Sequence, residues 1–310
     1  MAKYTVKLSG TGVEMPLLGL GTYKSGEEDL DEAVEAALRS GCRLVDCAAL
    51  YGNEAAVGAA LRRAFARGVA TRADVFVVSK LWNTEHAPAA VAAACRRSVE
   101  ALGVGPLDLY LVHWPVCYEP GQRPADVPAV PLAETWAAME RLVDDGLVRH
   151  IGTSNFTCRQ LDALLAHARI PPAVNQVEFH PLLQQRVQRA FCAAHGIALM
   201  GYRPLGNNSS PRRGADTPDV LQLPAVRAVA ERHGATPAQA VLAWAVRAGV
   251  SVVPKSVHPA RIAENMASLA LADALDDDDI RAIDALDAHI RTCGSVYSVG
   301  RSESEFWDGE

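Results

Sequence analysis

Short runs of apolar residues recur along the chain, and a longer stretch with helical spacing of apolar positions follows each one. The runs lie at 17–20, 43–46, 75–80, 107–113, 151–154, 174–178, 198–202 and 251–254. They do not alternate between apolar and polar residues, which is typical of strands buried on both faces in a parallel sheet. The stretches between and after them predict helices at 28–40, 53–66, 88–103, 133–145, 158–168, 184–195, 236–248 and 259–271.

Eight strands that alternate with eight helices predict a (β/α)8 TIM barrel. A doubly wound sheet is the alternative, but no Gly-x-Gly-x-x-Gly follows the first strand. Residues 4–15 carry a glycine-rich turn and predict an N-terminal β-hairpin. Two extra helices are expected near 224–234 and 277–288, before an irregular tail at 289–310. No linker divides the chain, so residues 1–310 are predicted to form a single domain.

Composition and charge exclude several classes of protein. The 310 residues carry 30 basic and 36 acidic side chains, a net charge of −6, which argues against a nucleic-acid-binding protein. No segment approaches the length of an apolar membrane span, and the first residues lack the apolar core of a signal peptide. Seven scattered cysteines without a Cys-x-x-Cys pair suit a reducing compartment. We therefore expect a cytoplasmic protein with no membrane partner.

Four consecutive aspartates at 276–279 could suggest a cation site. They lack the spacing of a calcium loop, and acidic side chains favour the positive end of a helix dipole. We interpret them as the solvated start of the last helix and predict no metal site.

Polar side chains stand where the second, third and fourth predicted strands end. Asp46 ends one strand and Tyr51 lies in its loop, while Lys80 and His113 end the next two strands. In a barrel the active site forms where strands end and the following loops begin. One such residue is more often a cap or a surface charge, but four complementary types at three successive strand ends favour a shared site.

These four side chains make chemical sense together. A nearby ammonium group favours the phenolate, so Lys80 should lower the pKa of Tyr51 and make it a useful proton donor. Burying Lys80 would be costly unless Asp46 pairs with it. His113 can orient a carbonyl oxygen by hydrogen bonding. Since no serine nucleophile or metal cluster accompanies them, a hydride from a bound cofactor is the fitting nucleophile.

Seven motifs in order resemble the aldo-keto reductases, and most of all their aldose/aldehyde reductase branch. They are Gly19-Leu-Gly-Thr, Asp46-x4-Tyr51, Ser79-Lys80-Leu-Trp, Leu111-Val-His113-Trp-Pro, Gly152-Thr-Ser-Asn-Phe, Asn175-Gln-Val-Glu and Pro254-Lys-Ser-Val-x3-Arg-Ile-x-Glu-Asn. The resemblance covers residues 4 to 300 and implies an NADPH-dependent reductase of aldehydes and ketones, usually monomeric. It makes Tyr51 the general acid, with His113 orienting the carbonyl and Lys80 and Asp46 tuning Tyr51.

The resemblance also implies which residues bind NADPH/NADP+. Around the nicotinamide they are Thr22, Ser154, Asn155, Gln176 and Tyr202, with Leu205 and Gly206 by the pyrophosphate. At the adenosine end they are Lys255, Ser256 and Arg261 for the 2′-phosphate, and Glu264 and Asn265 for the adenine. Taken alone, Ser154-Asn155 could be a helix N-cap, and Gln176 and Glu178 could be ordinary strand-end residues.

The residue types of the last motif also indicate a binding site, independently of the resemblance. Lys255, Ser256 and Arg261 place two cations and a hydroxyl between a strand end and a helix start. A phosphate group there gains charge-assisted hydrogen bonds and the favourable end of the helix dipole. A surface loop with two stray cations is the plainer alternative, and it would not need the accompanying serine.

Substrate contacts are expected beside the catalytic motifs. The predicted pocket residues are Tyr23, Leu50, Trp82, Trp114 and Cys293. Isolated aromatic residues are more often core packing, but their position at strand ends favours a pocket. By the resemblance, the tail at 289–310 folds over the barrel mouth and sets the choice of substrate.

The sequence departs from the branch at three informative places. Tyr23 stands where the branch often has tryptophan, and Arg203 stands where serine is usual. Residues 207–211 lack the acidic latch of the cofactor-covering loop. The last two departures concern the closure of this loop and the rate of cofactor release, and not the chemistry.

Two other classes of function are compatible with a barrel. One is a non-catalytic binding or structural relative that keeps the fold, which would have no evident need for the four complementary side chains. The other is a barrel hydrolase or isomerase, which predicts a carboxylate pair or a phosphate site after strands 7 and 8. A carbonyl reductase fits the sequence best, and the sequence does not identify which carbonyl compound is the substrate.

Overall fold

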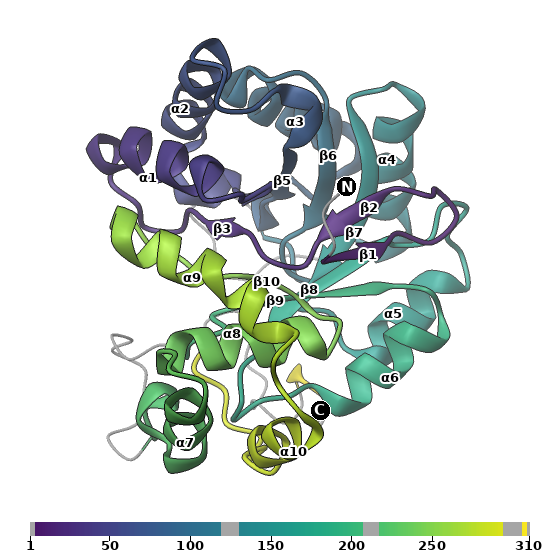
Figure 1. Cartoon of the computed structure of the whole chain (residues 1–310). Coiled ribbons are helices and arrows are strands. Elements are labelled where there is room, and N and C mark those ends of the chain that lie inside the picture. The colour runs from purple at the N-terminus through teal and green to yellow at the C-terminus, as the bar shows by residue number, and fades with distance from the viewer. Residues whose placement is uncertain (1–3, 119–129, 207–216, 294–305, 309–310) are drawn as a thin grey trace.

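The computed structural model describes residues 4–118, 130–206, 217–293 and 306–308. Eight parallel strands follow one another around a ring in the order of the sequence (Figure 1). They are β3 (Leu20–Gly21), β4 (Leu44–Asp46), β5 (Phe76–Leu81), β6 (Leu107–Val112), β7 (Val148–Ser154), β8 (Val174–Glu178), β9 (Ala198–Tyr202) and β10 (Ser251–Val253). Bridges from Leu18 to Val252 and from Gly21 to Lys255 join the first strand to the last. The predicted (β/α)8 barrel is confirmed, and the doubly wound alternative is wrong.

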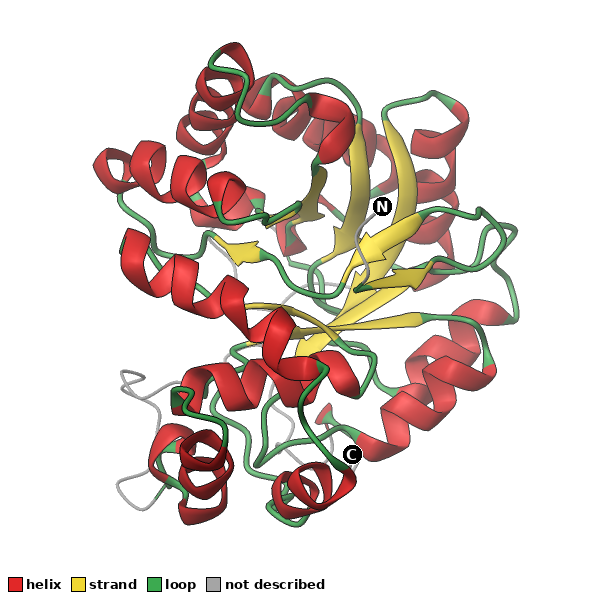
Figure 2. Ribbon diagram, viewed as in Figure 1, coloured by secondary structure: helices red, strands yellow, loops and turns green. Residues whose placement is uncertain are grey.

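Helices surround the ring of strands (Figure 2). They are α1 (Glu27–Arg39), α2 (Glu54–Ala66), α3 (Pro88–Leu102), α4 (Leu132–Asp144), α5 (Cys158–Leu165), α6 (Arg186–Ala194), α8 (Pro237–Arg247) and α9 (Pro259–Ala272). The two extra helices are α7 (Pro224–Arg232) and α10 (Asp277–Asp284). Each lies where the helical spacing of apolar residues predicted it. The last helix ends four residues earlier than expected, at Asp284 instead of 288.

Alternate residues of the strands point into the barrel, and this places the polar residues that follow. Leu44, Val78 and Leu111 belong to one buried cluster inside the ring. Asp46, Lys80 and His113 come two positions later on the same strands or directly after them. Because side chains repeat with a period of two along a strand, these polar groups also face inward, at the carboxyl end.

The N-terminal hairpin covers the opposite end of the barrel. Strands β1 (Thr5–Lys7) and β2 (Glu14–Pro16) pair antiparallel, as predicted. Leu8 and Met15 of the hairpin pack against Leu44, Phe76 and Val174, which lie at the amino ends of their strands. Figure 1 shows the two strands crossing that face. The hairpin therefore closes this end with apolar side chains.

The four aspartates form a helix start, as expected, but the prediction that all of them are solvated is wrong for Asp279. Asp276 is the N-cap of α10: its side chain accepts a hydrogen bond of 2.8 Å from the N–H of Asp279. Asp279 is buried and binds Arg232 of α7 and His233, the C-cap of that helix, at 2.6 and 2.7 Å. In the described parts of the chain, no group of His, Cys, Asp and Glu side chains has the arrangement of a metal site. No helix there has both the length and the apolarity to cross a membrane.

Candidate active site

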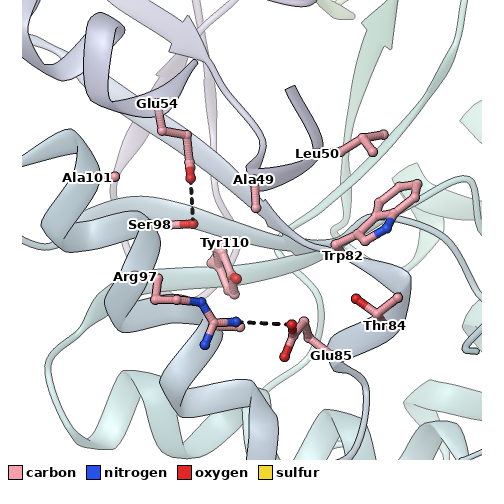
Figure 3. Close-up of a pocket in the computed structure, with 11 residues that line it drawn as sticks. Ala49, Leu50, Glu54, Trp82, Thr84, Glu85, Arg97, Ser98, Ala101 and Tyr110 are labelled. Atoms are coloured by element: carbon pink, nitrogen blue, oxygen red, sulfur yellow. Dashed lines mark hydrogen bonds and ion pairs between the residues drawn. The ribbon is translucent and has the colours of Figure 1, made fainter. Parts of the chain in front are cut away.

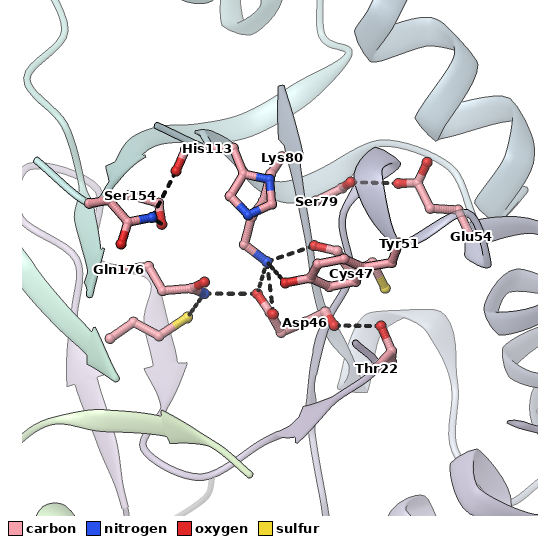
Figure 4. Close-up of polar contacts among 12 residues, drawn as sticks. Thr22, Asp46, Cys47, Tyr51, Glu54, Ser79, Lys80, His113, Ser154 and Gln176 are labelled. Carbon is pink, nitrogen blue, oxygen red and sulfur yellow. Dashed lines mark hydrogen bonds and ion pairs between the residues drawn. The ribbon is translucent and has the colours of Figure 1, made fainter. Parts of the chain in front are cut away.

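Four predicted catalytic side chains come together at the carboxyl end of the barrel (Figure 4). Asp46 is the last residue of β4, Lys80 lies near the end of β5, and His113 follows β6. Tyr51 ends the short 3-10 helix at Ala49–Tyr51, which turns the loop after β4 back over the barrel. The geometry thus brings together residues that are up to 67 positions apart in the sequence.

Lys80 is the centre of this arrangement. Its ammonium lies 2.7 and 2.8 Å from the two carboxylate oxygens of Asp46 and 2.8 Å from the carbonyl oxygen of Cys47. The hydroxyl of Tyr51 lies 3.2 Å from the same nitrogen. Lys80 is 0% exposed and Asp46 is 3% exposed. A lysine so deeply buried needs this pairing, because an uncompensated charge would be very costly there.

The expectation that Lys80 lowers the pKa of Tyr51 is wrong for this structure. Burial raises the pKa of Tyr51 well above its usual value, and the negative charge of Asp46 raises it further. Burial is the largest cause of this rise, and it outweighs the influence expected from the Lys80 ammonium, whose charge Asp46 balances. Tyr51 carries its proton at neutral pH, as a phenol does at its ordinary pKa.

His113 is neutral for a similar reason. Burial lowers its pKa well below the usual value, and the Lys80 charge lowers it further. Its backbone carbonyl accepts a hydrogen bond of 3.0 Å from the side chain of Asn155, and the Trp82 ring lies edge-on at 5.2 Å. Its Nδ1 is buried without a hydrogen-bond partner. A neutral imidazole held in this way can donate only one hydrogen bond.

Two predicted nicotinamide contacts are bonded directly to Asp46. The Thr22 hydroxyl donates to the backbone carbonyl of Asp46 at 2.8 Å, and the Gln176 amide donates to its carboxylate at 2.8 Å. The Gln176 amide also lies 2.6 Å from the sulfur of Met200, a contact that sequence reasoning missed. Gln176 therefore belongs to the hydrogen-bonded cluster around Asp46 and is not an ordinary strand-end residue.

Asn155 connects the end of β7 to the end of β9 by hydrogen bonds. It has a left-handed backbone, with φ of 64°, directly after β7. Its amide nitrogen also contacts the Ser154 hydroxyl at 3.1 Å, and its amide oxygen accepts 2.8 Å from the hydroxyl of Tyr202. The cap of α5 is Thr157, so the N-cap alternative for Ser154-Asn155 is wrong. Leu205, further along, packs partly buried against the core, and Gly206 follows it.

The predicted phosphate site lies apart from this cluster, at the end of β10. Lys255 bridges to Gly21, the residue before Thr22, so the two groups share one rim of the barrel. Lys255 and Arg261 are exposed, and neither makes an ion pair within the described residues. The Ser256 hydroxyl accepts 3.1 Å from the N–H of His258, the N-cap of α9, which itself offers no side-chain cap.

The two predicted adenine contacts, Glu264 and Asn265, have different surroundings. The Glu264 carboxylate accepts 2.6 Å from the hydroxyl of Thr236, so it is already engaged in holding the start of α8. Asn265 is buried on α9, where it lines a small cleft with Gly19 and Pro254.

The predicted substrate residues fall into two groups. Tyr23 and Leu50 are 43% and 41% exposed, and the Tyr23 ring lies 5.1 Å from that of Tyr51. Trp114 is only 4% exposed, because Phe306 and Trp307 cover it with ring centres at 6.2 and 6.1 Å. Cys293 and Trp82 pack beside this aromatic cluster. Residues 294–305 of the tail lie outside the described residues.

A cavity of about 340 Å³ lies beside these residues, outside the barrel (Figure 3). Leu50 and Trp82 form one wall, and residues of α2 and α3 form the other. Glu54 at its inner end is bonded to the hydroxyls of Ser79 and Ser98, at 2.5 and 3.0 Å. None of the four catalytic candidates lines it. It is therefore separate from the candidate active site.

Glu178 holds the segment after α10 in place, a role that sequence reasoning did not assign to it. Its carboxylate accepts hydrogen bonds from the N–H groups of Thr292 and Cys293, at 2.9 and 3.0 Å, and from the Thr292 hydroxyl. Burial alone would raise the pKa of Glu178, but these bonds and His180 lower it to about 2. The available signal was a carboxylate at the end of a fully buried strand.

Comparison with known proteins supports a family assignment. A sequence model of the Aldo/keto reductase family matches residues 17–288. An aldo/keto reductase of Synechocystis sp. is 43% identical over 289 residues, which cover 90% of this chain and 88% of that protein. Aldo-keto reductase family 1 member A1 of Bos taurus is 43% identical over 290 residues, covering 91% and 89%. The Homo sapiens protein of the same name is 45% identical over 265 residues, covering 83% and 82%.

Proposed function

The chain belongs to the aldo/keto reductase family, and from that premise we propose that it is an NADPH-dependent reductase of aldehydes and ketones with Tyr51 as its general acid. The observation that supports this most directly is the cluster around Lys80. One ammonium contacts both the Asp46 carboxylate and the Tyr51 hydroxyl, beside a neutral His113. Its place at the carboxyl end of the barrel is where enzymes of this fold carry out their chemistry.

The chain offers a fitting site for the cofactor. Lys255 and Arg261 are two exposed cations without an ion-pair partner among the described residues, as a 2′-phosphate requires. The N-terminus of α9, without a side-chain cap, lies beside them and favours an anion. At the other end, Asn155, Gln176 and Tyr202 gather amide and aromatic groups next to Lys80. When bound, the cofactor supplies the hydride.

Tyr51 is suited to give the proton. It carries its proton at neutral pH, as a phenol does at its ordinary pKa, and burial raises that pKa further. As the carbonyl oxygen gains negative charge, the Tyr51 hydroxyl can donate to it, and the Lys80 ammonium at 3.2 Å then stabilises the phenolate left behind. Asp46 holds the Lys80 ammonium in position while this happens.

His113 is suited to orient the substrate. A neutral imidazole can donate a hydrogen bond to the carbonyl oxygen without competing with Tyr51 for the proton transfer. The Trp82 ring packs edge-on against the imidazole, and Asn155 holds the His113 backbone through its carbonyl. Tyr23, Leu50, Trp114 and Cys293 would then surround the rest of the substrate.

A direct assay tests the proposal. Mixing the protein with NADPH and 4-nitrobenzaldehyde should lower the absorbance at 340 nm, and the Tyr51→Phe variant should bind NADPH without that change. Binding of NADPH with no turnover in the native protein would instead support a non-catalytic relative. We further propose that the protein is a cytoplasmic monomer, which sedimentation and cell fractionation can check.

A further inference from the structure

Two neighbouring strands approach the same residue of the segment after α10. Strands β8 and β9 are paired so that Glu178 lies opposite Tyr202, and Arg203 is the next residue. Thr292, which is 4% exposed, contacts both Glu178 and Arg203. One point of the C-terminal segment is therefore held from two strand ends.

Glu178 fixes the backbone at this point. It is 1% exposed, and its carboxylate accepts from the successive N–H groups of Thr292 and Cys293. Two successive backbone donors on one carboxylate define the direction of the chain as well as its position. Hydrogen bonds to a charged group are the stronger kind, so this attachment is firm.

Arg203 fixes the side chain of the same residue. Its guanidinium donates to the Thr292 hydroxyl at 3.4 Å, and that hydroxyl donates in turn to Glu178. The backbone of Arg203 has φ of 54°, a left-handed conformation that is uncommon for residues other than glycine and persists when the surroundings hold it. A serine, expected here from the sequence resemblance, would have neither the length nor the charge to make this contact.

The position of Thr292 determines that of Cys293. Cys293 packs with Trp82, Trp114 and Trp307 in the aromatic cluster beside the candidate active site. It is close enough to Tyr51 for its thiol to influence that residue's pKa. A shift of Thr292 would therefore move one wall of the substrate pocket.

We propose that Arg203 is a specificity-determining positioning residue, which through Thr292 and Glu178 holds Cys293 against the pocket and limits the size of aldehyde that reaches Tyr51. The proposal rests on the proposed reductase function. Arg203 contacts Thr292 and is not one of the four catalytic candidates, so its loss should leave the proton transfer itself intact.

Four variants test the link. Arg203→Ser and Thr292→Val each break it, whereas Thr292→Ser keeps the hydroxyl and should behave as the native protein does. Arg227→Ser, on the exposed face of α7, is the matched loss of an arginine elsewhere. Iodoacetamide labelling of Cys293, followed by peptide mass spectrometry, measures the wall position without any turnover. Cys158 in the same sample serves as the internal reference.

In Arg203→Ser, Cys293 should be labelled about threefold faster or more, the effect of losing one modest hydrogen bond. Labelling should accelerate at least as much in Thr292→Val, which loses the bonds of the hydroxyl to both Arg203 and Glu178. Each should lower KM for bulky aldehydes relative to the smallest one, with kcat for the smallest within about twofold. The double variant should match Thr292→Val alone, because both changes remove one link. Unchanged labelling and unchanged KM ratios in Arg203→Ser would overturn the proposal, even if Thr292→Val fails to fold. Faster labelling in a protein without reductase activity would keep the link and reject the proposed function.

Discussion

The ammonium of Lys80 lies 2.7 Å from a carboxylate oxygen of Asp46, and both side chains are buried. This pair supports both the fold and the chemistry. It keeps a cation beneath Tyr51, and it is also the charge balance that allows a lysine to occupy the interior of the barrel mouth.

Replacing one member of the pair should therefore destabilise the protein strongly. Asp46→Asn leaves the Lys80 charge buried without its partner, at an expected cost of about 3–5 kcal/mol in the free energy of unfolding. Urea denaturation at pH 7 measures this. The double variant Asp46→Asn/Lys80→Met should regain part of the stability because no charge remains. A loss below about 1 kcal/mol in Asp46→Asn would contradict the pairing.

Removing the Tyr51 hydroxyl should abolish most of the reduction. Tyr51→Phe keeps the ring and its packing but loses the proton donor, so kcat/KM for aldehydes should fall at least ~10²-fold. NADPH affinity, measured by quenching of tryptophan fluorescence, should stay within a few-fold. Near-native turnover in this variant would reject Tyr51 as the acid.

The choice of cofactor should depend on the two exposed cations. The native protein should prefer NADPH to NADH, and Lys255→Met/Arg261→Met should lose this preference by tenfold or more. The reason is that each charge-assisted hydrogen bond to the 2′-phosphate contributes roughly 1.5–3 kcal/mol. The kcat/KM ratio for the two cofactors is the measurement, and equal efficiency with both in the native protein would refute the assignment.

Shortening the chain should change substrate choice more than cofactor binding. Removal of 293–310 takes away Phe306 and Trp307, which cover Trp114. NADPH binding should stay within a few-fold because Lys255 and Arg261 lie on another element. Efficiency should fall most for bulky apolar aldehydes and least for the smallest. A uniform loss across a graded aldehyde series would mean that the tail only supports the fold.

Acid should weaken the fold partly through His86. Burial lowers its pKa from 6.5 to about 4. The unfolded chain therefore binds this proton more readily than the native state between these values. The stabilisation is complete above about pH 6.5 and declines as the pH falls toward 4, by about 2 kcal/mol from pH 7 to pH 5. His86→Gln should flatten the pH dependence of unfolding, and His167→Gln, on the surface, should not.

The barrel could be predicted because each of its strands and helices is encoded by the apolar pattern of its own segment. Each strand, such as β8, is a short apolar run and each helix has its own spacing of apolar residues, so the alternation can be read one segment at a time. The cluster of the four catalytic candidates could be predicted for the same reason, since strand ends converge in a barrel whatever its detailed packing.

The parts that were missed depend on contacts between distant segments. The hydrogen bond between Glu178 and Thr292 joins residues 114 positions apart, and no local sequence pattern predicts it. The pKa of Tyr51 was wrong because its sign depends on whether burial and Asp46 outweigh the Lys80 charge. That balance is set by distances that a sequence does not contain.

The N-terminal hairpin closes the amino end of the barrel, so the barrel is open only at its carboxyl end. Leu8 and Met15 seal the other end, so nothing passes through the ring of strands. Under the proposed function, the nicotinamide would lie on the floor beside Lys80 and the carbonyl compound above it. Entry and exit would then share one opening, so a cofactor bound beneath the substrate would have to bind before it and leave after the alcohol.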